Sequence, residues 1–288
     1  MNIDITALYV CLDDFCKMYK SSQKSHLLPS IKSRNRDGYL SLSEILLIEI
    51  AFHFSPYKNF KCYYLHGIMG DHRDKFGRLP SYQRFVALKK HLFMPLTILL
   101  HNLSGEETGI YFADATSLKV CRNKRISRHK VFGGLAARGK TTMGWFFGLK
   151  LHIAINHKGQ IMAVKITPGN TSDPSVLAGL MNNLQGKCYV DKAYIGKKLF
   201  AELWKSGMHL VVGIRSNMKN YLMPFIDKML LRKRYLIETV FGILKTDMNL
   251  EHSRHRSPIN AFINIMACIA AYAYKTNKPK MRAFLIEA

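Results

Sequence analysis

The spacing of apolar and polar residues predicts that the first third of the chain is helical. Ser41-Leu-Ser-Glu44 has the sequence of a capping box, in which two side chains satisfy backbone amides at a helix N-terminus. The helix that begins there runs to about His53 and ends before Ser55-Pro56. Further helices are predicted over 59–69 and from Ser81 to about Leu92. Three short helices with many surface cations are typical of a helix-turn-helix module, and also of an ordinary helical packing domain.

After residue 105 the pattern changes to short apolar runs that predict strands. The predicted strands cover 109–120, 145–156, 160–167, 187–191 and 209–214. The predicted helices cover 171–184, 195–206, 228–248 and 258–274. This order, β-β-β-α-β-α-β-α-α, is the ribonuclease H-like arrangement, in which an antiparallel three-stranded meander is extended by parallel strands. We therefore expect an α/β fold, with a small all-α, helix-turn-helix-like domain at 1–105. A ribonuclease H-like mixed sheet flanked by helices follows at 106–288.

The charge balance indicates a polyanionic partner. The chain has 43 Lys+Arg against 19 Asp+Glu, a formal net charge of +24. Such an excess attracts polyanions and supplies phosphate affinity that does not depend on sequence. A basic protein without a specific ligand, for example a ribosome-associated one, is the alternative at this point.

Three of the few carboxylates lie among apolar residues. Asp114 lies inside the first predicted strand, Asp191 ends the fourth, and Glu238 lies within the helix predicted over 228–248. Burying them costs desolvation energy unless a cation lies beside them, and Mg²⁺ binds such oxygen ligands. In this fold the first and fourth strands are neighbours, so the three carboxylates could hold two metal ions about 3.5–4 Å apart for phosphoryl transfer. The alternative is three unrelated acids, each satisfied by a Lys, an Arg or a backbone amide.

The helix around Glu238 has a polar face and an apolar face. Arg234 and Lys245 lie on the same face as Glu238, and Gly242 leaves a gap where a phosphate backbone could approach. An apolar stripe faces the core: Ile237, Val240, Phe241 and Leu244. A plain i,i+4 ion pair between Arg234 and Glu238 is the alternative, but it explains neither Gly242 nor Lys245.

A long basic connection joins the first two predicted strands. Its candidate DNA-binding residues are Arg122, Arg125, Arg128, Lys130, Arg138 and Lys140. Lys192, next to Asp191, is a further candidate. A solvated surface loop is the alternative for the connection. Trp145 and Trp204 are candidates for base stacking, although single tryptophans are more often core residues.

Other features exclude several classes of protein. The six cysteines include no C-x-x-C pair, which argues against a zinc finger and favours buried free thiols in a reducing compartment. The longest nearly apolar stretch, 262–274, is too short to span a bilayer, which needs about 20 residues. With no signal-peptide pattern at the N-terminus, we expect a soluble, cytoplasmic protein with no membrane partner.

At Asp114, Asp191-Lys-Ala-Tyr194 and Arg234-x-x-x-Glu238-x6-Lys245, the chain resembles the DDE transposases of bacterial insertion sequences. More narrowly, it resembles the insertion-sequence-982 family. Sequence segments similar to those of this family lie at 120–126, 144–152, 167–171, 231–234 and 251–257, with further similarity at 13–16 and 57–60.

The resemblance implies that Asp114, Asp191 and Glu238 are catalytic metal ligands, and that Arg234 and Lys245 hold DNA phosphates near the cut site. The expected cofactor is Mg²⁺, replaceable by Mn²⁺, with two ions per active site. The implied reaction is cleavage at terminal inverted repeats and transfer of the 3′-hydroxyl ends to target DNA, without ATP.

The implied partners are double-stranded DNA, as inverted-repeat ends and target, and a second copy of the chain, forming a dimer in a synaptic complex. The implied location is the bacterial cytoplasm, with the nucleoid when DNA is bound. Two alternatives remain: a ribonuclease H-like nuclease or junction resolvase without strand transfer, and a DNA-binding regulator whose acids are structural.

Overall fold

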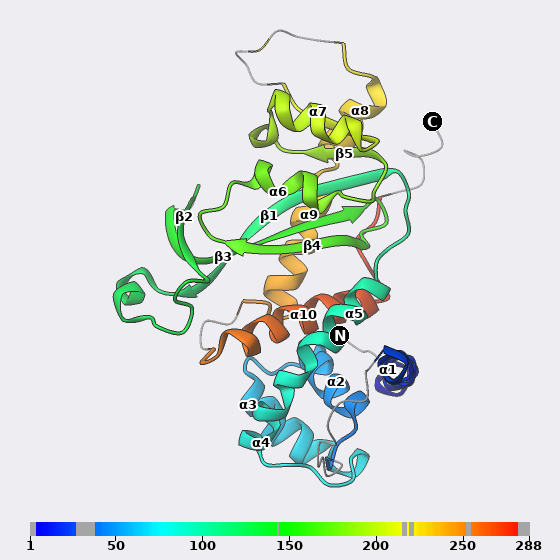
Figure 1. Cartoon of the computed structure of the whole chain (residues 1–288), viewed down its shortest axis with the longest axis vertical. Coiled ribbons are helices and arrows are strands. Elements are labelled where there is room, and N and C mark those ends of the chain that lie inside the picture. The colour runs from blue at the N-terminus through cyan, green and yellow to red at the C-terminus, as the bar shows by residue number, and fades with distance from the viewer. Residues whose placement is uncertain are drawn as a thin grey trace. The chain divides into compact units, whose positions relative to one another are not determined.

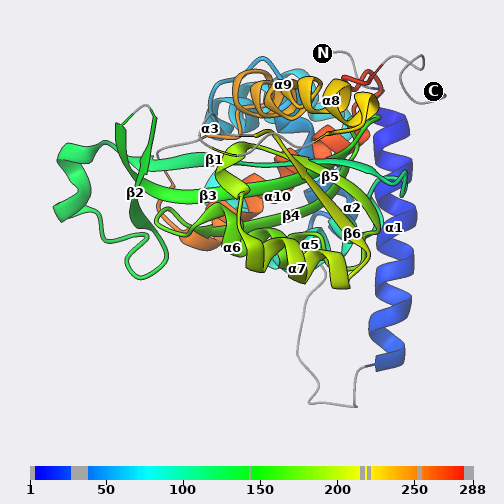
Figure 2. The same ribbon diagram turned by 90° about the horizontal axis from the view of Figure 1, so that it is seen from above.

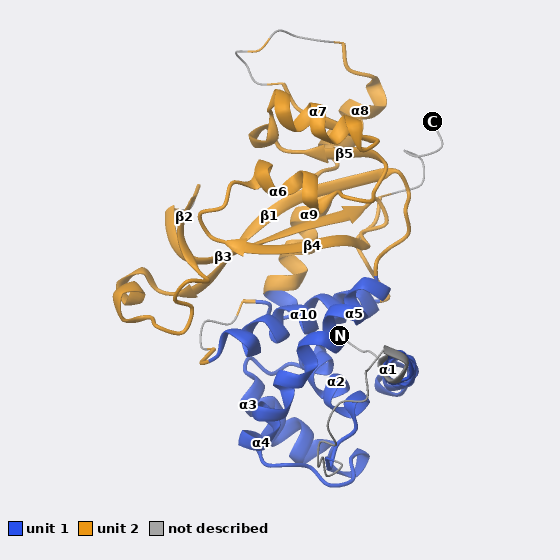
Figure 3. Cartoon of the chain, viewed as in Figure 1, with its two compact units in different colours: residues 1–103, 246–250, 257–275 blue, residues 104–245, 251–256, 276–288 orange. Residues whose placement is uncertain are grey.

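The computed structural model divides the chain into two compact units (Figure 3). Unit 1 comprises residues 1–103, 246–250 and 257–275, and unit 2 comprises 104–245, 251–256 and 276–288. The residues that the structure describes are 4–26, 38–142, 144–214, 218, 222–251 and 255–281. Three residues of the sequence segment 251–257, His252, Ser253 and Arg254, lie outside the described residues.

Unit 1 is built from helices (Figure 1). They are α1 (Ile5–His26), α2 (Leu42–Ala51), α3 (Phe60–Cys62), α4 (Tyr82–Leu88), α5 (Phe93–Asn102) and α10 (Pro258–Tyr274). Short 3₁₀ turns are η1 (Phe52–Phe54), η3 (Arg73–Lys75) and η4 (Lys89–Leu92), and η2 (Tyr63–Asp71) is π-helical. The capping box is confirmed: Glu44 N donates to Ser41 Oγ at 3.2 Å, and Ser41 N donates to Glu44 Oε2 at 2.6 Å.

The last helix, α10, has the predicted bounds, but it belongs to unit 1 and not with the sheet. It packs against α2 and α5, and eleven of its residues are buried. A helix that is apolar around most of its circumference needs partners on several sides. The neighbouring helices of unit 1 provide them, whereas sequence order suggested the sheet domain.

A buried ion pair joins α2 to η4. Lys89 Nζ lies 2.6 Å from Glu49 Oε1, and the side chains are 6% and 0% exposed. Lys89 Nζ also lies 4.3 Å from the centroid of the Phe60 ring. Each charge of such a pair depends on the other, because neither can reach water.

Unit 2 contains the sheet. Its strands are β1 (Ile110–Cys121), β2 (Ala137–Thr141), β3 (Gly144–Asn156), β4 (Ile161–Pro168), β5 (Gly186–Val190) and β6 (Met208–Val212). Its helices are α6 (Asp173–Leu180), α7 (Lys197–Lys205), α8 (Phe225–Arg232) and α9 (Tyr235–Gly242), with 3₁₀ turns η5 (Asn123–Arg128) and η6 (Lys192–Tyr194). The π-helical η7 (Ile243–Asp247) continues α9.

The sheet is mixed and has the predicted strand order. β1 pairs antiparallel with β3 and β3 with β4, while β1 pairs parallel with β5 and β5 with β6. The first and fourth predicted strands are therefore neighbours, as expected. Figure 2 shows α6 and α7 on one face and α8 and α9 on the other. On the α6 and α7 face, Tyr111, Cys188, Leu177 and Leu203 belong to one buried apolar cluster.

The structure differs from the predicted elements at two places. No strand was predicted within the basic connection, but 137–141 forms β2, which pairs with β3. Its Ala-Arg-Gly-Lys-Thr sequence has no apolar alternation, so the pairing determines its conformation. The helix predicted over 228–248 is two helices with a turn at Lys233–Arg234. That turn contains neither Pro nor Gly, so no residue there marks a helix end.

All six cysteines are free, and Cys16, Cys188 and Cys268 are buried. Across the described ranges, none of the helices combines the length and apolar character needed to cross a membrane.

We predict that Lys89→Met destabilises the protein by about 3–5 kcal/mol, because it leaves the Glu49 carboxylate buried without a counter-charge. Chemical denaturation measures the loss. The double variant Glu49→Leu/Lys89→Met should recover most of it. Lys90→Met, at an exposed neighbouring position, is the control and should change the stability little. A full-sized loss in the double variant would contradict this account.

Candidate active site

The register of β1 and β5 brings Asp114 and Asp191 to the same face of the sheet. The last paired residues are Phe112 and Tyr189, whose ring centroids are 5.7 Å apart. Asp114 and Asp191 follow two residues later along the two parallel strands. Since side chains alternate along a strand, both aspartates lie on the face of Phe112 and Tyr189.

Arg234 joins Asp114 to Glu238. Its Nη1 lies 3.3 Å from Asp114 Oδ2, and its Nη2 lies 3.0 Å from Glu238 Oε1. The Arg234 and Asp114 side chains are 23% and 25% exposed, and Glu238 is 57% exposed. The i,i+4 pair between Arg234 and Glu238 therefore exists, and the same guanidinium reaches across to β1.

The surroundings of Asp114 change the pKa of its carboxylate strongly. Burial raises its pKa to about 6. The Ala115 amide, which donates to Asp114 Oδ1 at 2.8 Å, and the charge of Arg234 both lower the pKa, while the charges of Asp173 and Asp191 raise it. Any positive charge near this carboxylate therefore stabilises its ionised form.

Asp191 lies at the start of η6 and is exposed. Its Oδ1 accepts a hydrogen bond from the backbone amide of Lys192 at 2.7 Å. The other oxygen of the carboxylate has no protein contact of this kind in the described structure. The exposed side chain of Lys192 follows directly after it in the chain.

Lys245 lies against the edge of β1 rather than standing free on the surface. Its Nζ donates to Ser117 O at 2.7 Å and lies 4.0 Å from Glu251 Oε2, and its side chain is 27% exposed. Burial lowers the pKa of Lys245, the charge of Glu251 raises it, and that of Lys119 lowers it. Beyond Phe112, β1 has no β5 residue beside it, so side chains satisfy this edge. Lys119 N donates to Glu251 Oε1 at 2.8 Å in the same way.

Gly242 lies on the exposed side of α9. No atom lies within 4 Å of the position that a Cβ would take there. The predicted apolar stripe on the opposite side is confirmed, because its four residues are buried: Ile237, Val240, Phe241 and Leu244.

A buried carboxylate, Asp227, fastens α8 to β5. Tyr189 Oη donates to Asp227 Oδ1 at 2.7 Å, and Lys187 Nζ donates to both carboxylate oxygens at 2.9 Å. Tyr189 lies two residues before Asp191, so this contact anchors the strand that carries the site. Sequence reasoning missed Asp227. The one indication in the sequence is that Asp227 is an acidic residue close to the apolar residues Phe225 and Ile226.

Another polar cluster was also missed. Lys150 Nζ donates to Asp173 Oδ1 and to Thr171 O, both at 2.9 Å. His152 Nε2 lies 2.9 Å from Thr167 Oγ1, and burial lowers the pKa of His152 to about 4. Lys150 and His152 alternate with apolar residues along β3 and lie on the α6 side of the sheet.

The carboxylates offer the chemistry that a hard divalent cation needs, although they do not form a closed cage. Within the described ranges, no group of three His, Cys, Asp or Glu residues is placed to hold a metal ion. The guanidinium of Arg234 lies between Asp114 and Glu238 instead. Carboxylate oxygens are nevertheless the preferred ligands of such ions, and the raised pKa of Asp114 marks a position where added positive charge is favourable.

The predicted basic residues gather on one lobe of unit 2. η5, β2 and the start of β3 form this lobe (Figures 1 and 2). All six candidates on it are exposed: Arg122, Arg125, Arg128, Lys130, Arg138 and Lys140. The sequence has no Asp or Glu between Ala115 and Ser172, so the lobe contains no carboxylate to neutralise them.

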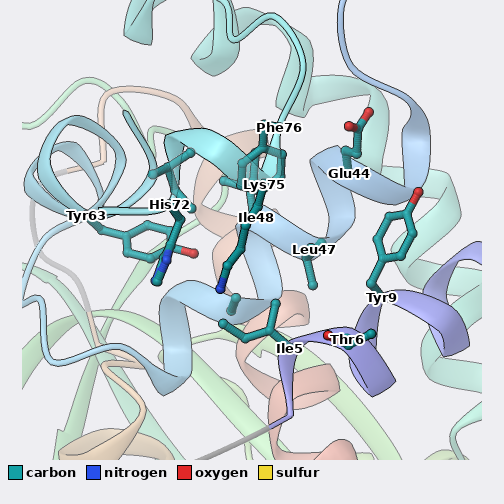
Figure 4. Close-up of a pocket in the computed structure, with 12 residues that line it drawn as sticks. Ile5, Thr6, Tyr9, Glu44, Leu47, Ile48, Tyr63, His72, Lys75 and Phe76 are labelled. Carbon is teal, nitrogen blue, oxygen red and sulfur yellow. The ribbon is translucent and has the colours of Figure 1, made fainter. Parts of the chain in front are cut away.

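A cavity of about 410 Å³ lies in unit 1 (Figure 4). Its lining is mostly apolar and includes Ile5 and Tyr9 of α1 and Leu47 and Ile48 of α2. The carboxylate of Glu44, at its rim, is already bonded to Ser41 N. His72 and Lys75 also line the cavity, but none of the three predicted carboxylates, Asp114, Asp191 and Glu238, does.

Residues 104–258 match the family described as "Transposase DDE domain". Since the match covers more than half of the chain, the chain belongs to this family. It is thus a transposase-type enzyme that cuts DNA and transfers strands, and enzymes of this family generally use divalent metal ions.

Two solved structures are similar to the chain. One is titled a piggyBac transposase synaptic complex with hairpin DNA, with 9% identity, a TM-score of 0.49, and coverage of 95% of this chain and 75% of that chain. The other is titled the Mos1 mariner paired end complex with Mn, with 10% identity, a TM-score of 0.24, and coverage of 94% and 97%. No curated protein matches the chain.

We predict that Asp114→Asn stabilises the protein at pH 8 when divalent metal is absent. The folded-state pKa of Asp114 is raised to about 6, so the charged carboxylate costs stability, and that cost grows as the pH rises from about 4 through 6. Thermal unfolding in EDTA should show a higher melting temperature for the variant at pH 8 and none of this gain below pH 4. Asp191→Asn is the control: the position is exposed, the new side chain keeps an oxygen that accepts from the Lys192 amide, and the melting temperature should change little. Equal stabilisation by both variants would refute the assignment to burial.

We predict the opposite pH dependence for Asp227→Asn. Burial raises the pKa of Asp227, but hydrogen bonds from Tyr189 and Lys187 and the charge of Lys187 outweigh burial, so the pKa is lowered. Its stabilisation is therefore present above about pH 4 and is lost as the pH falls further. At pH 7 the variant should lose about 2 kcal/mol, measured by denaturation. Tyr189→Phe, which keeps the ion pair, should lose less. A difference from the unsubstituted chain that does not shrink below pH 4 would contradict this reasoning.

Proposed function

We propose that this chain is a DNA transposase that cuts at the terminal inverted repeats of its own mobile element and joins the 3′-hydroxyl ends to target DNA. The observation that carries the proposal is that Asp114 and Asp191 lie on one face of a mixed sheet, where Arg234 joins Asp114 to Glu238. In a chain of the transposase DDE family, these three acids supply the Asp-Asp-Glu set. The closer relationship to the insertion-sequence-982 family, and with it a bacterial source, is part of the proposal.

Asp114, Asp191 and Glu238 would hold the divalent ions, two Mg²⁺ with Mn²⁺ as a substitute. When bound, the ions activate the attacking oxygen and stabilise the leaving oxygen at phosphorus. The protein's own contribution is to fix the carboxylates on two adjacent strands and one helix. Asp227 and Tyr189 keep the strand of Asp191 against α8, and Ala115 N orients the carboxylate of Asp114.

Arg234 would act as an exchangeable counter-charge. With no metal or DNA bound, its guanidinium stabilises the carboxylates of Asp114 and Glu238. A planar guanidinium is equally suited to a phosphate, which it binds in a bidentate manner. We propose that Arg234 turns to a DNA phosphate when the carboxylates take up metal. The open space at Gly242 gives the DNA backbone room on the same helix.

The basic surface would bind double-stranded DNA as element ends and target. Lys192, beside Asp191, and the exposed cations of the lobe supply phosphate contacts. Lys245 is proposed to contact a phosphate too, although its bond to Ser117 O means that it also closes the edge of β1. An element has two ends to be cut and joined, so we propose a homodimer that holds both ends in a synaptic complex.

We predict that Asp191→Asn abolishes DNA cleavage and joining but leaves DNA binding intact, because it removes ligand charge and keeps the basic surface. The substrate is a pre-cut duplex from the DNA that flanks the coding region, incubated with a supercoiled target plasmid and Mg²⁺ or Mn²⁺. Glu202→Gln, an exposed acid on α7, is the matched control and should retain activity. Joined products that depend on Asp191 support the proposal.

Other outcomes favour the alternatives. Nicks without joined products would indicate a nuclease that does not transfer strands. Binding with no cleavage by the unsubstituted chain, together with unchanged cellular activity of Asp114→Asn, would indicate a DNA-binding regulator.

A further inference from the structure

Trp145 is exposed at the start of β3, on the basic lobe. Its side chain is 52% exposed. A single exposed aromatic side chain is common on protein surfaces, so its role depends on the residues around it. Trp145 lies directly opposite Lys140 in the β2–β3 ribbon, and Arg138 is opposite Phe147. These side chains therefore share one face of the ribbon, which we call the ribbon face (Arg138, Lys140 and Trp145).

Two cations lie over the indole ring. The guanidinium carbon of Arg138 lies 5.0 Å from the ring centroid of Trp145, and Lys140 Nζ lies 5.8 Å away. Neither cation has an acidic partner on the lobe, since the sequence lacks carboxylates from Ala115 to Ser172. The ribbon face thus combines an aromatic surface with positive charge that its own lobe does not neutralise.

The ribbon is held so that this face points outward. Its other face is closely packed: a Cβ at Gly139 would meet the Phe146 ring at 2.7 Å. Phe146 is buried, which fixes the alternation of side chains along β3. Asn123 Nδ2 donates to Trp145 O at 2.9 Å and fastens η5 to the ribbon. The site is therefore formed in advance and does not depend on ordering a loop.

We propose that the ribbon face binds single-stranded DNA, with an unpaired base stacked on Trp145 and its phosphates on Arg138 and Lys140. A positively charged surface with an exposed aromatic ring is the combination that single-stranded nucleic acid binds. Within duplex DNA the bases are stacked on one another, so an indole beside the duplex meets phosphates and not the faces of the bases. The ligand is then an overhang or an opened DNA end. This inference rests on the proposed function for DNA as the ligand, but it requires neither the carboxylates nor metal.

The first experiment uses the fluorescence of Trp145 in the full chain. Because the chain contains 2 tryptophans, Trp204→Phe leaves Trp145 as the single indole. In EDTA, a pyrimidine oligonucleotide should quench its emission, and a blunt duplex of equal length should quench it far less. Equal quenching by both ligands, or none by the oligonucleotide, would overturn the proposal.

The second experiment compares binding to a duplex with a short single-stranded overhang and to the blunt duplex. Trp145→Ala should lower affinity for the overhang substrate about tenfold, the size of one lost stacking contact, and leave blunt-end affinity unchanged. Trp204→Ala is the matched control: that ring is 67% exposed, but it contacts His209 and no described cation lies over it. It should change neither affinity.

Lys140→Gln should weaken both substrates and reduce the salt dependence of binding, as expected for a lost phosphate contact. Equal weakening of both substrates by Trp145→Ala would show that Trp145 only supports the cations, and would overturn the stacking role. An unchanged melting temperature of Trp145→Ala excludes a folding defect. Because all binding is measured in EDTA, loss of the overhang preference and loss of strand transfer are separate results.

Discussion

The desolvated carboxylate of Asp114 needs positive charge beside it, and the rest of the site is arranged around that need. Burial of the Asp114 side chain raises the pKa of the carboxylate to about 6. The guanidinium of Arg234 supplies this positive charge, and it also connects Asp114 to Glu238. A strongly basic chain can keep acids in such a place only if cations compensate them. The same requirement makes the site receptive to a divalent ion.

Two sets of side-chain contacts keep the acidic residues in register. On β5, the bond from Tyr189 to Asp227 holds the strand against α8, two residues before Asp191. On β1, Lys245 and Glu251 satisfy the edge that β5 leaves open. These contacts connect the sheet to the segments that carry or follow Glu238. Rigid strands with anchored neighbours are what a site for phosphoryl transfer requires, because reacting groups must be aligned closely.

The sequence predicted most of the sheet because its strands are long or strongly apolar, and their order alone made β1 and β5 neighbours. It also predicted the capping box at Ser41 and the bounds of α10, which are local features. It did not predict β2, the turn at Lys233–Arg234, or the unit to which α10 belongs. The double pairing of Arg234 and the burial of Asp227 were also missed. The place of α10 and the contacts of Arg234 with Asp114 and of Asp227 with β5 depend on segments distant in the chain, which local periodicity does not record. β2 pairs with the next strand along the chain, but its polar sequence has no strand-like alternation.

Cleavage of the polypeptide by a bound iron ion tests directly whether Asp114, Asp191 and Glu238 bind divalent metal in one place. Iron(II) bound in place of Mg²⁺ gives one electron to added hydrogen peroxide, which splits into a hydroxide ion and a hydroxyl radical, and the radical cuts the polypeptide near the metal. Mass spectrometry of the fragments locates the cuts. If the three carboxylates share one metal site, the cuts cluster around these residues, excess Mg²⁺ suppresses them and Asp114→Asn removes them. Cuts elsewhere in the chain, or cuts that Mg²⁺ does not suppress, would show that the three carboxylates do not bind metal together.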